Sequence, residues 1–303
     1  MDCNVKKKVN GVNGSPTAAG MGIAPGRGRV PESQEHQGML RPSSSESPKK
    51  FRVASLNIGT MTGKSREIVE VMMRRRVDVA CVQEVRWKGE RAREVGEGYK
   101  IFYVGEQSGR NGVGVIVSSS LVDNVVEVKR CSSRLMKVKL VWEGTVVNVV
   151  CAYAPQVGLS DEEKEEFWAT FDTLISEING REKLVVGGDF NGHVGRENVG
   201  FKEVHGGFGF GSRNKEGETL LEEAVAHGLV VLNTMFKKRE GHLVTYESGG
   251  RRSQIDYIMT RMQDKRTCIN CKVLPGEGEE QHKLIVADMV MSAKRKTGMD
   301  VIK

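Results

Sequence analysis

Long apolar stretches are missing from this 303-residue sequence. The longest, such as residues 113–117 and 146–150, are far shorter than the roughly 20 residues that cross a bilayer, and no apolar segment near Met1 resembles a secretory signal. Six cysteines are also too few for a disulfide-stabilised scaffold. These absences argue against an integral membrane protein and a secreted protein. They predict an intracellular globular domain, nuclear or cytoplasmic, with reduced thiols.

Aromatic residues are absent from residues 1–50, which hold five of the seven prolines and carry eight basic against four acidic side chains. Such a segment cannot bury enough apolar surface to offset the entropy lost on ordering. We therefore predict a disordered basic tail over residues 1–50, a folded domain over 51–292 and a short basic tail over 293–303. The lysines at 6–8 are a candidate polyanion-binding or nuclear-targeting segment, but a solvated tail is the favoured interpretation.

The folded part alternates between strand-like and helix-like segments. Apolar runs predict strands over 51–58, 77–82, 99–104, 112–117, 125–129, 136–142, 145–153, 183–188, 230–233, 255–259 and 284–287. One helix is expected over 65–76, a second after a capping box at 160–163, and a third between Asn214 and Gly228. Many short strands with interspersed helices indicate an α+β domain, in which helices lie outside a sandwich of sheets.

Polar residues recur where the apolar strands end or begin. They are Asn57, Glu84, Asp189, Asn191, Asp256 and His282. A single acid at such a place is usually a turn residue, whereas several together indicate a convergent polar site on a rigid sheet. Carboxylates with asparagine and histidine, and without a cysteine pair nearby, favour Mg²⁺ or Mn²⁺ over zinc.

Six short motifs surround these residues. In chain order they are Leu56-Asn57-Ile58-Gly59, Val82-Gln83-Glu84, Gly112-Val113-Gly114-Val115, Tyr153-Ala154-Pro155, Gly188-Asp189-Phe190-Asn191 and Gln254-Ile255-Asp256-Tyr257. As a set they resemble the endonuclease/exonuclease/phosphatase superfamily, which includes DNase I and the class II abasic-site endonucleases. The resemblance extends from Phe51 to about Val290. Segments 188–195 and 232–234, with Thr245, are most similar to endonuclease domains of non-LTR retrotransposons and their craniofacial development protein 2-like relatives.

The resemblance implies a four-layered α/β sandwich of two packed mixed sheets with outer helices, and metal-dependent phosphodiester hydrolysis. It implies that Glu84 binds the metal and that Asn57 supports this site. Mg²⁺ is the expected cofactor, and Mn²⁺ is expected to substitute for it. The chemistry agrees, because the phosphodiester is anionic and a bound cation stabilises the charge that develops during hydrolysis.

Catalytic roles also come from the resemblance. It implies that Asp189 aligns and activates the attacking water, that Asn191 binds the phosphate or holds Asp189, and that Tyr153 contacts the phosphate. His282 is expected to polarise a phosphoryl oxygen. Asp256 would orient the His282 imidazole and favour its cationic form, which suits a group beside phosphate.

One position departs from the superfamily pattern, which usually places an aspartate directly before the catalytic histidine. Here Gln281 precedes His282. In the family that aspartate lies beside the metal, so the neutral Gln281 predicts a weaker metal site and slow turnover. Mn²⁺, which binds nitrogen and oxygen ligands more tightly than Mg²⁺, is expected to rescue part of the loss.

Two further residues are candidates for substrate binding. Tyr246 lies between the basic segments 237–239 and 251–252, where a role at the edge of bound DNA competes with a solvated loop. His193 follows Asp189 closely and is a candidate for the mouth of the site.

Two other patterns are better explained by structure than by a binding site. Asn111-Gly112 before an apolar run predicts a hairpin turn rather than a phosphate-binding loop. Cys268 and Cys271 form a C-x-x-C pair without a second pair or a nearby histidine, so we expect ordinary thiols rather than a zinc site.

The leading functional prediction is a monomeric, Mg²⁺-dependent endonuclease that cuts DNA at abasic or loosely specified sites and derives from a retrotransposon. Because the sequence ends at Lys303, we do not expect it to retrotranspose alone. One alternative is a phosphatase or phosphodiesterase that acts on an inositol phosphate or RNA. A second, non-catalytic alternative is a domesticated or decayed relative that only binds nucleic acid.

Overall fold

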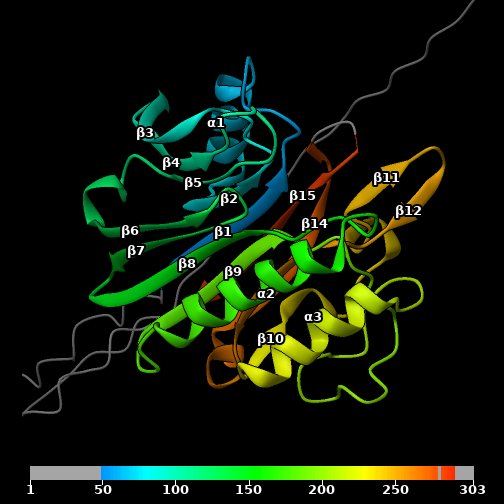
Figure 1. Ribbon diagram of the computed structural model, residues 1–303. Coiled ribbons are helices and arrows are strands. Elements are labelled where there is room, and N and C mark those ends of the chain that lie inside the picture. Colours follow the sequence, from blue (N-terminus) through cyan, green and yellow to red (C-terminus); the bar gives the residue numbers. More distant parts are fainter. Residues whose placement is uncertain (1–48, 279–280, 291–303) are drawn as a thin grey trace, which may run out of the picture. The chain divides into compact units, whose positions relative to one another are not determined.

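The computed structural model describes residues 49–278 and 281–290 (Figure 1). The predicted tails at 1–50 and 293–303 lie outside the described residues, apart from Lys49 and Lys50, and they stay predictions. The first strand begins at Lys50, one residue before the predicted start of the folded domain. No helix among the described residues is long and apolar enough to cross a membrane.

Two mixed sheets form the centre of the fold. In spatial order, the seven-stranded sheet contains β14 (Cys268–Gly278), β15 (Lys283–Val290), β1 (Lys50–Asn57), β2 (Val79–Gln83), β5 (Val113–Val117), β4 (Tyr99–Gly105) and β3 (Gly89–Gly96). The six-stranded sheet contains β10 (Leu229–Val231), β13 (Asp256–Arg261), β9 (Lys183–Asp189), β8 (Thr145–Tyr153), β7 (Leu135–Trp142) and β6 (Val125–Ser132). In each sheet one central pair is parallel, β1 with β2 and β8 with β9, and the other pairs are antiparallel.

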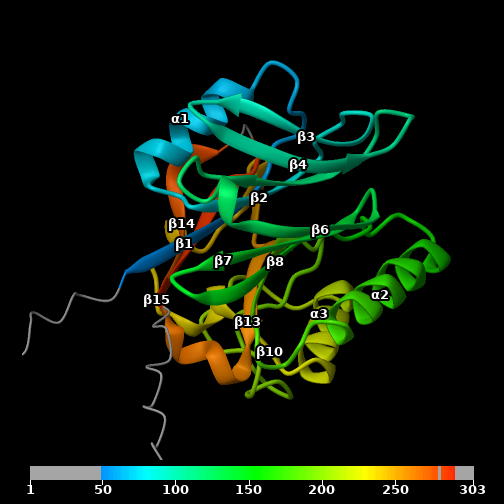
Figure 2. The ribbon, with the colours of Figure 1, turned by 90° about the vertical axis from the view of Figure 1, so that its left-hand side faces the viewer.

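Helices cover the outer faces of both sheets. They are α1 (Ser65–Arg75), α2 (Asp161–Ser176) and α3 (Lys215–Ala226). Figure 2 shows α1 on one side of the sandwich and α2 with α3 on the other. Three separate apolar cores fill the spaces, one between the sheets and one under each helical layer. The predicted four-layered α+β sandwich is therefore confirmed.

Several local signals produced the expected elements. The Ser160 hydroxyl accepts a hydrogen bond from the Glu163 amide, and Glu163 returns one from its carboxylate to the Ser160 amide, so the capping box starts α2. Asn214 caps α3 through the amide of Gly217. Gly144 lies in the turn that joins the antiparallel strands β7 and β8, as predicted.

Other elements were not predicted from the sequence. Strand β3 was missed because five of its eight residues are exposed and most of those are charged, as suits the edge of a sheet. Strand β14 was missed because Pro275 and two glycines interrupt its apolar pattern. The expected strand over 230–233 was too long, since its last two residues form a short 3₁₀ turn, η2 (Leu232–Met235).

The remaining elements are short. Three 3₁₀ turns, η1 (Val122–Asn124), η3 (Glu240–His242) and η4 (Met262–Thr267), connect strands. A two-stranded hairpin, β11 (Tyr246–Ser248) with β12 (Arg251–Ser253), projects from the body of the domain (Figure 1). Asn111 and Gly112 both have positive φ. They end the connection of residues 106–112 between the antiparallel strands β4 and β5, so they belong to a hairpin connection as predicted, but its turn lies at residues 107–108.

Strand direction decides where the polar residues gather. β1, β2, β8 and β9 all end at the same edge of the sandwich, whereas β13 and β15 begin there, because each runs antiparallel to its neighbour. Residues that end one strand and residues that begin its antiparallel neighbour therefore lie at the same edge, although they are distant in the sequence.

Candidate active site

Three polar side chains lie next to one another across the six-stranded sheet. Tyr153, the last residue of β8, is in register with Asp189, the last residue of β9. Asp189 is in turn in register with Asp256, the first residue of β13. All three side chains are buried. The sheet thus fixes their spacing without depending on a flexible loop.

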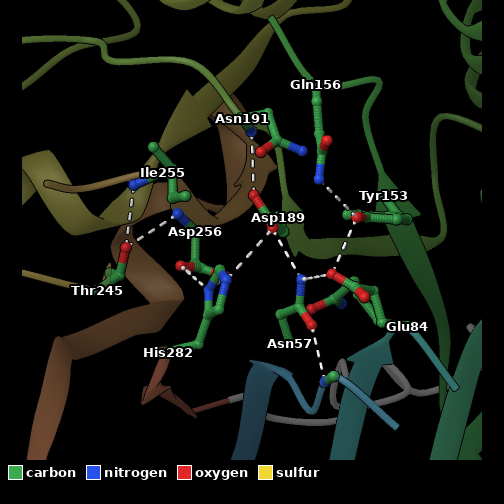
Figure 3. Close-up of polar contacts among 12 residues, drawn as sticks. Asn57, Glu84, Tyr153, Gln156, Asp189, Asn191, Thr245, Ile255, Asp256 and His282 are labelled. Atoms are coloured by element: carbon green, nitrogen blue, oxygen red, sulfur yellow. Dashed lines mark hydrogen bonds and ion pairs between the residues drawn. The ribbon is translucent and has the colours of Figure 1, made fainter. Parts of the chain in front are cut away.

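Asn57 joins this row to the other sheet (Figure 3). Its Nδ2 donates to Oε1 of Glu84 and to Oδ2 of Asp189, each over 3.0 Å. Its Oδ1 accepts from the backbone amide of Gly59 at 3.0 Å, which fixes the orientation of the amide. Asn57 therefore holds two carboxylates from the two sheets at a defined separation.

Glu84 follows β2 in a left-handed backbone conformation, with φ of 57°. Besides Asn57, its Oε1 accepts a hydrogen bond from the Tyr153 hydroxyl at 3.0 Å, and its Oε2 pairs with the guanidinium of Arg86. Burial raises the pKa of Glu84, but the hydrogen bonds from Arg86, Asn57 and Tyr153 outweigh burial and lower it. Glu84 is therefore an ionised oxygen donor at neutral pH.

His282 pairs with Asp256 and stands over Asp189. Its Nδ1 lies 3.1 Å from Oδ2 of Asp256, and its Nε2 lies 3.9 Å from Oδ2 of Asp189. Burial lowers the pKa of His282, but the charge and hydrogen bond of Asp256 outweigh burial and, with the other carboxylates, raise it to about 9. The imidazole is therefore cationic at neutral pH. The ring of Tyr246 lies against it, with 4.7 Å between the ring centroids.

Asp256 is itself held from two sides. The Thr245 hydroxyl accepts hydrogen bonds from the amides of Ile255 and Asp256, at 3.0 and 3.1 Å. Asn233 donates to the Asp256 carbonyl and accepts from the amide of Ile258, at 2.9 and 3.0 Å. These neutral partners fix the backbone of the residue that orients His282.

Asp189 lies at the centre of the cluster. Its Oδ1 accepts from the backbone amide of Asn191 at 3.0 Å, and the Asn191 side chain is anchored to the Ala154 carbonyl at 2.9 Å. Burial and the nearby charge of Asp256 raise the pKa of Asp189 to about 7, although His282 opposes them. A carboxylate with this pKa is suited to take a proton near neutral pH.

The donor set fits a hard divalent cation. Oxygen and nitrogen atoms of Asp189, Asp256 and His282 lie within 4.8 Å of one another, and Glu84 is linked to Asp189 through Asn57. Three carboxylates against one imidazolium leave an excess of negative charge, which a cation would relieve. Carboxylate oxygens are the donors that Mg²⁺ and Mn²⁺ prefer.

In protein freed of divalent metal, the free energy of unfolding should fall as the pH rises from 6.5 to about 9. Folded His282 keeps its proton up to about pH 9, whereas an unfolded histidine loses it near its ordinary value of 6.5. The stabilisation is therefore complete below pH 6.5 and is lost as the pH approaches 9. The raised pKa of Asp189 acts in the same direction between 3.8 and about 7.

Thermal unfolding in EDTA at pH 6.5 and 9 measures this difference, which should amount to a few degrees in the melting temperature. His282→Gln should reduce the pH dependence. An unchanged pH dependence in that variant would assign the effect to other groups.

The side chains of two sequence candidates form no hydrogen bond with the cluster in the described part of the chain. His193 is tied to the start of α3, since its backbone amide donates to Oδ1 of Asn214 at 2.8 Å, and burial lowers the pKa of its ring. The Gln281 amide donates to Ser248 of the β11–β12 hairpin at 3.1 Å. Within residues 49–278 and 281–290, neither side chain has a hydrogen bond to Glu84, Asp189, Asp256 or His282. Their substrate-binding and metal-site roles stay predictions.

Gln281→Asp should lower the Mg²⁺ concentration needed for half-maximal activity. A carboxylate in place of the amide adds negative charge beside His282, and groups that support a metal site are typically worth about 10- to 100-fold in affinity or activity. A Mg²⁺ titration of the cleavage rate measures the change, with Gln263→Asp, a substitution of the same kind outside the cluster, as the control. If both variants match the unaltered protein, position 281 does not contribute to the metal site.

The structure also brings in residues that the sequence did not single out. Arg86 pairs with Glu84, and Gln156 lies 3.5 Å from the Tyr153 hydroxyl through its Nε2. None of the six motifs includes Arg86. Its position two residues after Glu84 was the only available signal. Asn233 was noted only as part of a family motif, and its support of Asp256 depends on tertiary contacts.

A groove of about 560 Å³ opens beside Glu84 and Tyr153. Polar residues from four loops and from α2 line it, among them Arg86, Arg110, Asn111, Ser133, Arg134 and Gln156. It provides a polar approach to Glu84 and Tyr153 whose lining holds both arginines and glutamates.

Comparison with known proteins shows which family has this sequence pattern. Residues 54–261 match the model of the endonuclease/exonuclease/phosphatase family. The chain belongs to this family. Craniofacial development protein 2 from Bos taurus is 28% identical over 249 residues, which cover 80% of this chain and 42% of that protein. The chain thus spans less than half the length of this relative.

Solved structures support the fold. The endonuclease domain of TRAS1, a telomere-specific non-LTR retrotransposon, has a TM-score of 0.59 at 15% identity. An AP endonuclease from Archaeoglobus fulgidus has a TM-score of 0.60 at 18% identity. Each match covers 80% of this chain and 100% of the other. The predicted resemblance to the endonuclease/exonuclease/phosphatase family, and to craniofacial development protein 2, is confirmed, and the solved structures confirm the fold.

Proposed function

We propose that this member of the endonuclease/exonuclease/phosphatase family is a Mg²⁺-dependent endonuclease that nicks DNA. The observation that carries the proposal is the cluster in which Asn57 links Glu84 to Asp189 while the Asp256–His282 pair lies on the other side of Asp189. The similarity to an AP endonuclease and to a retrotransposon endonuclease domain supports DNA as the substrate.

Glu84 would hold the metal, and Asn57 links it to Asp189, whose carboxylate lies within 4.8 Å of ligand atoms of Asp256 and His282. Bound Mg²⁺ supplies positive charge that stabilises the developing negative charge on the phosphate. Asn57 contributes by holding the Glu84 and Asp189 carboxylates at a fixed separation through its two hydrogen bonds. Without this link the two like charges would repel each other.

The protein's own side chains account for the remaining requirements of hydrolysis. Asp189, anchored by Asn57 and the Asn191 amide, can orient a water molecule and take its proton. The cationic His282 can donate a hydrogen bond from Nε2 to a phosphoryl oxygen, because Asp256 occupies its Nδ1. Asn191 and Tyr153 both lie beside Asp189, with the Tyr153 hydroxyl also at Glu84 (Figure 3), and both would contact the phosphate.

Further parts of the proposal rest on the resemblance and on composition. We propose that the domain derives from a retrotransposon, acts as a monomer, and works in the nucleus or cytoplasm. The alternatives are hydrolysis of another phosphoester, such as an inositol phosphate or RNA, and nucleic-acid binding without turnover. The intact polar cluster favours catalysis over binding alone.

A substrate comparison tests the proposal. Supercoiled plasmid, a duplex with one abasic site, single-stranded RNA and an inositol polyphosphate are each incubated with Mg²⁺ or EDTA. We expect Mg²⁺-dependent cleavage of the two DNA substrates, with the abasic duplex cut at its lesion if damage is recognised. Phosphate release from the inositol compound alone would favour the phosphatase alternative, and binding without turnover would favour the non-catalytic one.

Glu84→Gln should reduce activity strongly and raise the Mg²⁺ requirement. The substitution replaces an ionised oxygen donor with a neutral amide of nearly the same shape, so folding stability should change little. The rate as a function of Mg²⁺ concentration measures the effect, with Glu90→Gln on the exposed edge strand β3 as the control. Unchanged cleavage at limiting Mg²⁺ would remove Glu84 from the metal site.

A further inference from the structure

Arg86 is the cationic side chain that faces the proposed metal ligand. Its guanidinium pairs with Oε2 of Glu84, whereas Asn57 and Tyr153 both donate to Oε1. The Glu84 side chain is 17% exposed and the Arg86 side chain is 51% exposed. The ion pair thus lies at the boundary between the buried cluster and solvent.

The backbone around Arg86 is fixed even though its side chain is exposed. Glu84 and Arg86 both have positive φ, 57° and 56°, which turns their side chains toward each other on either side of the buried Val85. The amides of Val85 and Arg86 donate to the carbonyls of Gly112 and Asn111, both at 3.0 Å. Left-handed conformations at two charged residues are unfavourable and persist only where the surroundings enforce them. The fold therefore maintains this pairing at a cost.

A guanidinium on Oε2 competes with any metal ion that binds Glu84. Both are cations, and Oε1 already accepts two hydrogen bonds from the cluster. A divalent ion must therefore share Glu84 with Arg86 or displace it. Because the ion pair is half exposed, its net stabilisation is small, of the size typical for surface pairs, so displacement is feasible.

The groove beside Glu84 gives a displaced guanidinium an anionic target. Arg86, Arg110 and Arg134 all line it. Arg134 is held in place, since its Nη1 donates to the Tyr153 carbonyl at 3.3 Å and its guanidinium lies 5.1 Å from the centre of the Tyr153 ring. Three guanidinium groups beside a phosphodiesterase site suit the oxygens of a neighbouring phosphate, which arginine binds through paired hydrogen bonds.

The groove is also lined by Glu106, Glu163 and Glu166, so its three arginines stand in a lining of mixed charge. The Glu106 carboxylate accepts hydrogen bonds from the side chains of Asn111, Ser133 and Ser108, at 2.6 to 2.8 Å. Glu163 is engaged in the capping box of α2. Among the described residues, neither Glu106 nor Glu163 forms an ion pair with any of the three arginines, although both acids keep their charge. Burial raises the pKa of Glu106, but its hydrogen bonds and the nearby Arg110 lower it.

We propose that Arg86 exchanges partners, from Glu84 in the metal-free protein to a phosphate of the nucleic-acid substrate once a divalent cation binds Glu84. This inference rests on the proposed function, and it assigns Arg86 to substrate binding. The exchange couples metal binding to substrate binding, because the metal releases the side chain that the substrate then engages.

The proposal predicts that Arg86→Gln strengthens metal binding and weakens DNA binding. Without nucleic acid, the variant should bind Mn²⁺ roughly two- to fivefold more tightly, since the competing ion pair is gone. With metal present, it should bind a DNA duplex about tenfold more weakly, since a charged hydrogen bond to phosphate is lost. A residue that merely holds Glu84 in place would instead weaken metal binding when replaced.

Free Mn²⁺ measured by electron paramagnetic resonance gives the metal affinity, and fluorescence anisotropy of a labelled duplex gives the DNA affinity. DNA binding is measured in an Asp189→Asn background, so that turnover does not consume the substrate. Arg110→Gln removes the same charge from the same groove, and Arg86→Lys keeps the charge but not the paired hydrogen bonds. Glu84→Gln reports separately whether Mn²⁺ occupies this site.

Tighter Mn²⁺ binding in Arg86→Gln, together with unchanged Mn²⁺ binding in Arg110→Gln and weaker DNA binding in Arg86→Gln, supports the exchange. Unchanged or weaker Mn²⁺ binding in Arg86→Gln overturns it, as does unchanged DNA affinity. If Glu84→Gln leaves Mn²⁺ binding intact, the proposed metal site fails first, and the failure is distinguishable from failure of the Arg86 exchange alone.

Discussion

Asp189→Asn should lower the rate of DNA cleavage by about 10²- to 10⁴-fold, the usual contribution of a positioned base, while DNA binding is retained or slightly tightened. Asp189 is buried at the centre of the cluster, and it accepts hydrogen bonds from Asn57 and from the Asn191 amide. The asparagine keeps the shape but cannot take a proton from water near neutral pH. It also removes a negative charge that repels the phosphate.

Single-turnover cleavage rates and duplex binding in parallel measure the two effects. Asp123→Asn, at an exposed position in η1, serves as the control for loss of one carboxylate charge. Loss of binding together with catalysis, accompanied by a lower melting temperature, would mean that Asp189 has a structural role instead.

His282→Gln should produce a loss of similar size, about 10²- to 10⁴-fold, and should alter the pH profile. Burial lowers the pKa of His282, but Asp256 and the other carboxylates raise it to about 9 in the metal-free protein, and a bound divalent cation lowers it from that value. The unaltered protein should therefore show a falling rate on the alkaline side, at or below pH 9, that is missing in His282→Gln.

Asp256→Asn provides a sharper form of the same test. The Asp256 charge is the main cause that raises the pKa of His282, so its removal should shift the alkaline limb toward the ordinary value of 6.5. His242→Gln is the control, because its ring hydrogen-bonds to the Val273 carbonyl outside the cluster. If the alkaline fall in rate is not shifted in Asp256→Asn, the group that causes it is not His282.

The sequence predicted the cluster well because its residues share a local signal. Asn57, Glu84 and Asp189 each follow an apolar run that could only be a buried strand, and Asp256 begins one. Their convergence follows from strand direction. Their order in space, however, depends on the pairing of strands distant in the chain, and the pattern alone does not contain that information.

Residues without such a signal were not found. Arg86 reaches Glu84 because both residues adopt positive φ, and the spacing of apolar residues in the sequence does not predict φ. His193 lies close to Asp189 in sequence, and its backbone amide is tied to the start of α3. Its place at the mouth of the site stays a prediction.

The edge strand β3 was missed for a related reason. β3 is long and well paired with β4, but its exposed charges gave it the appearance of a loop. Burial on both faces makes β1 and β9 recognisable, whereas an edge strand can satisfy its backbone hydrogen bonds with a polar sequence.

The most direct test of the central claim is plasmid nicking by the unaltered protein and by Asp189→Asn from matched purifications, each with Mg²⁺ and with EDTA. We predict open circles only from the unaltered protein with Mg²⁺, and none above background from the variant or in EDTA. Nicking at equal rates by both proteins, or nicking that persists in EDTA, would contradict the claim that this cluster is a metal-dependent phosphodiesterase site.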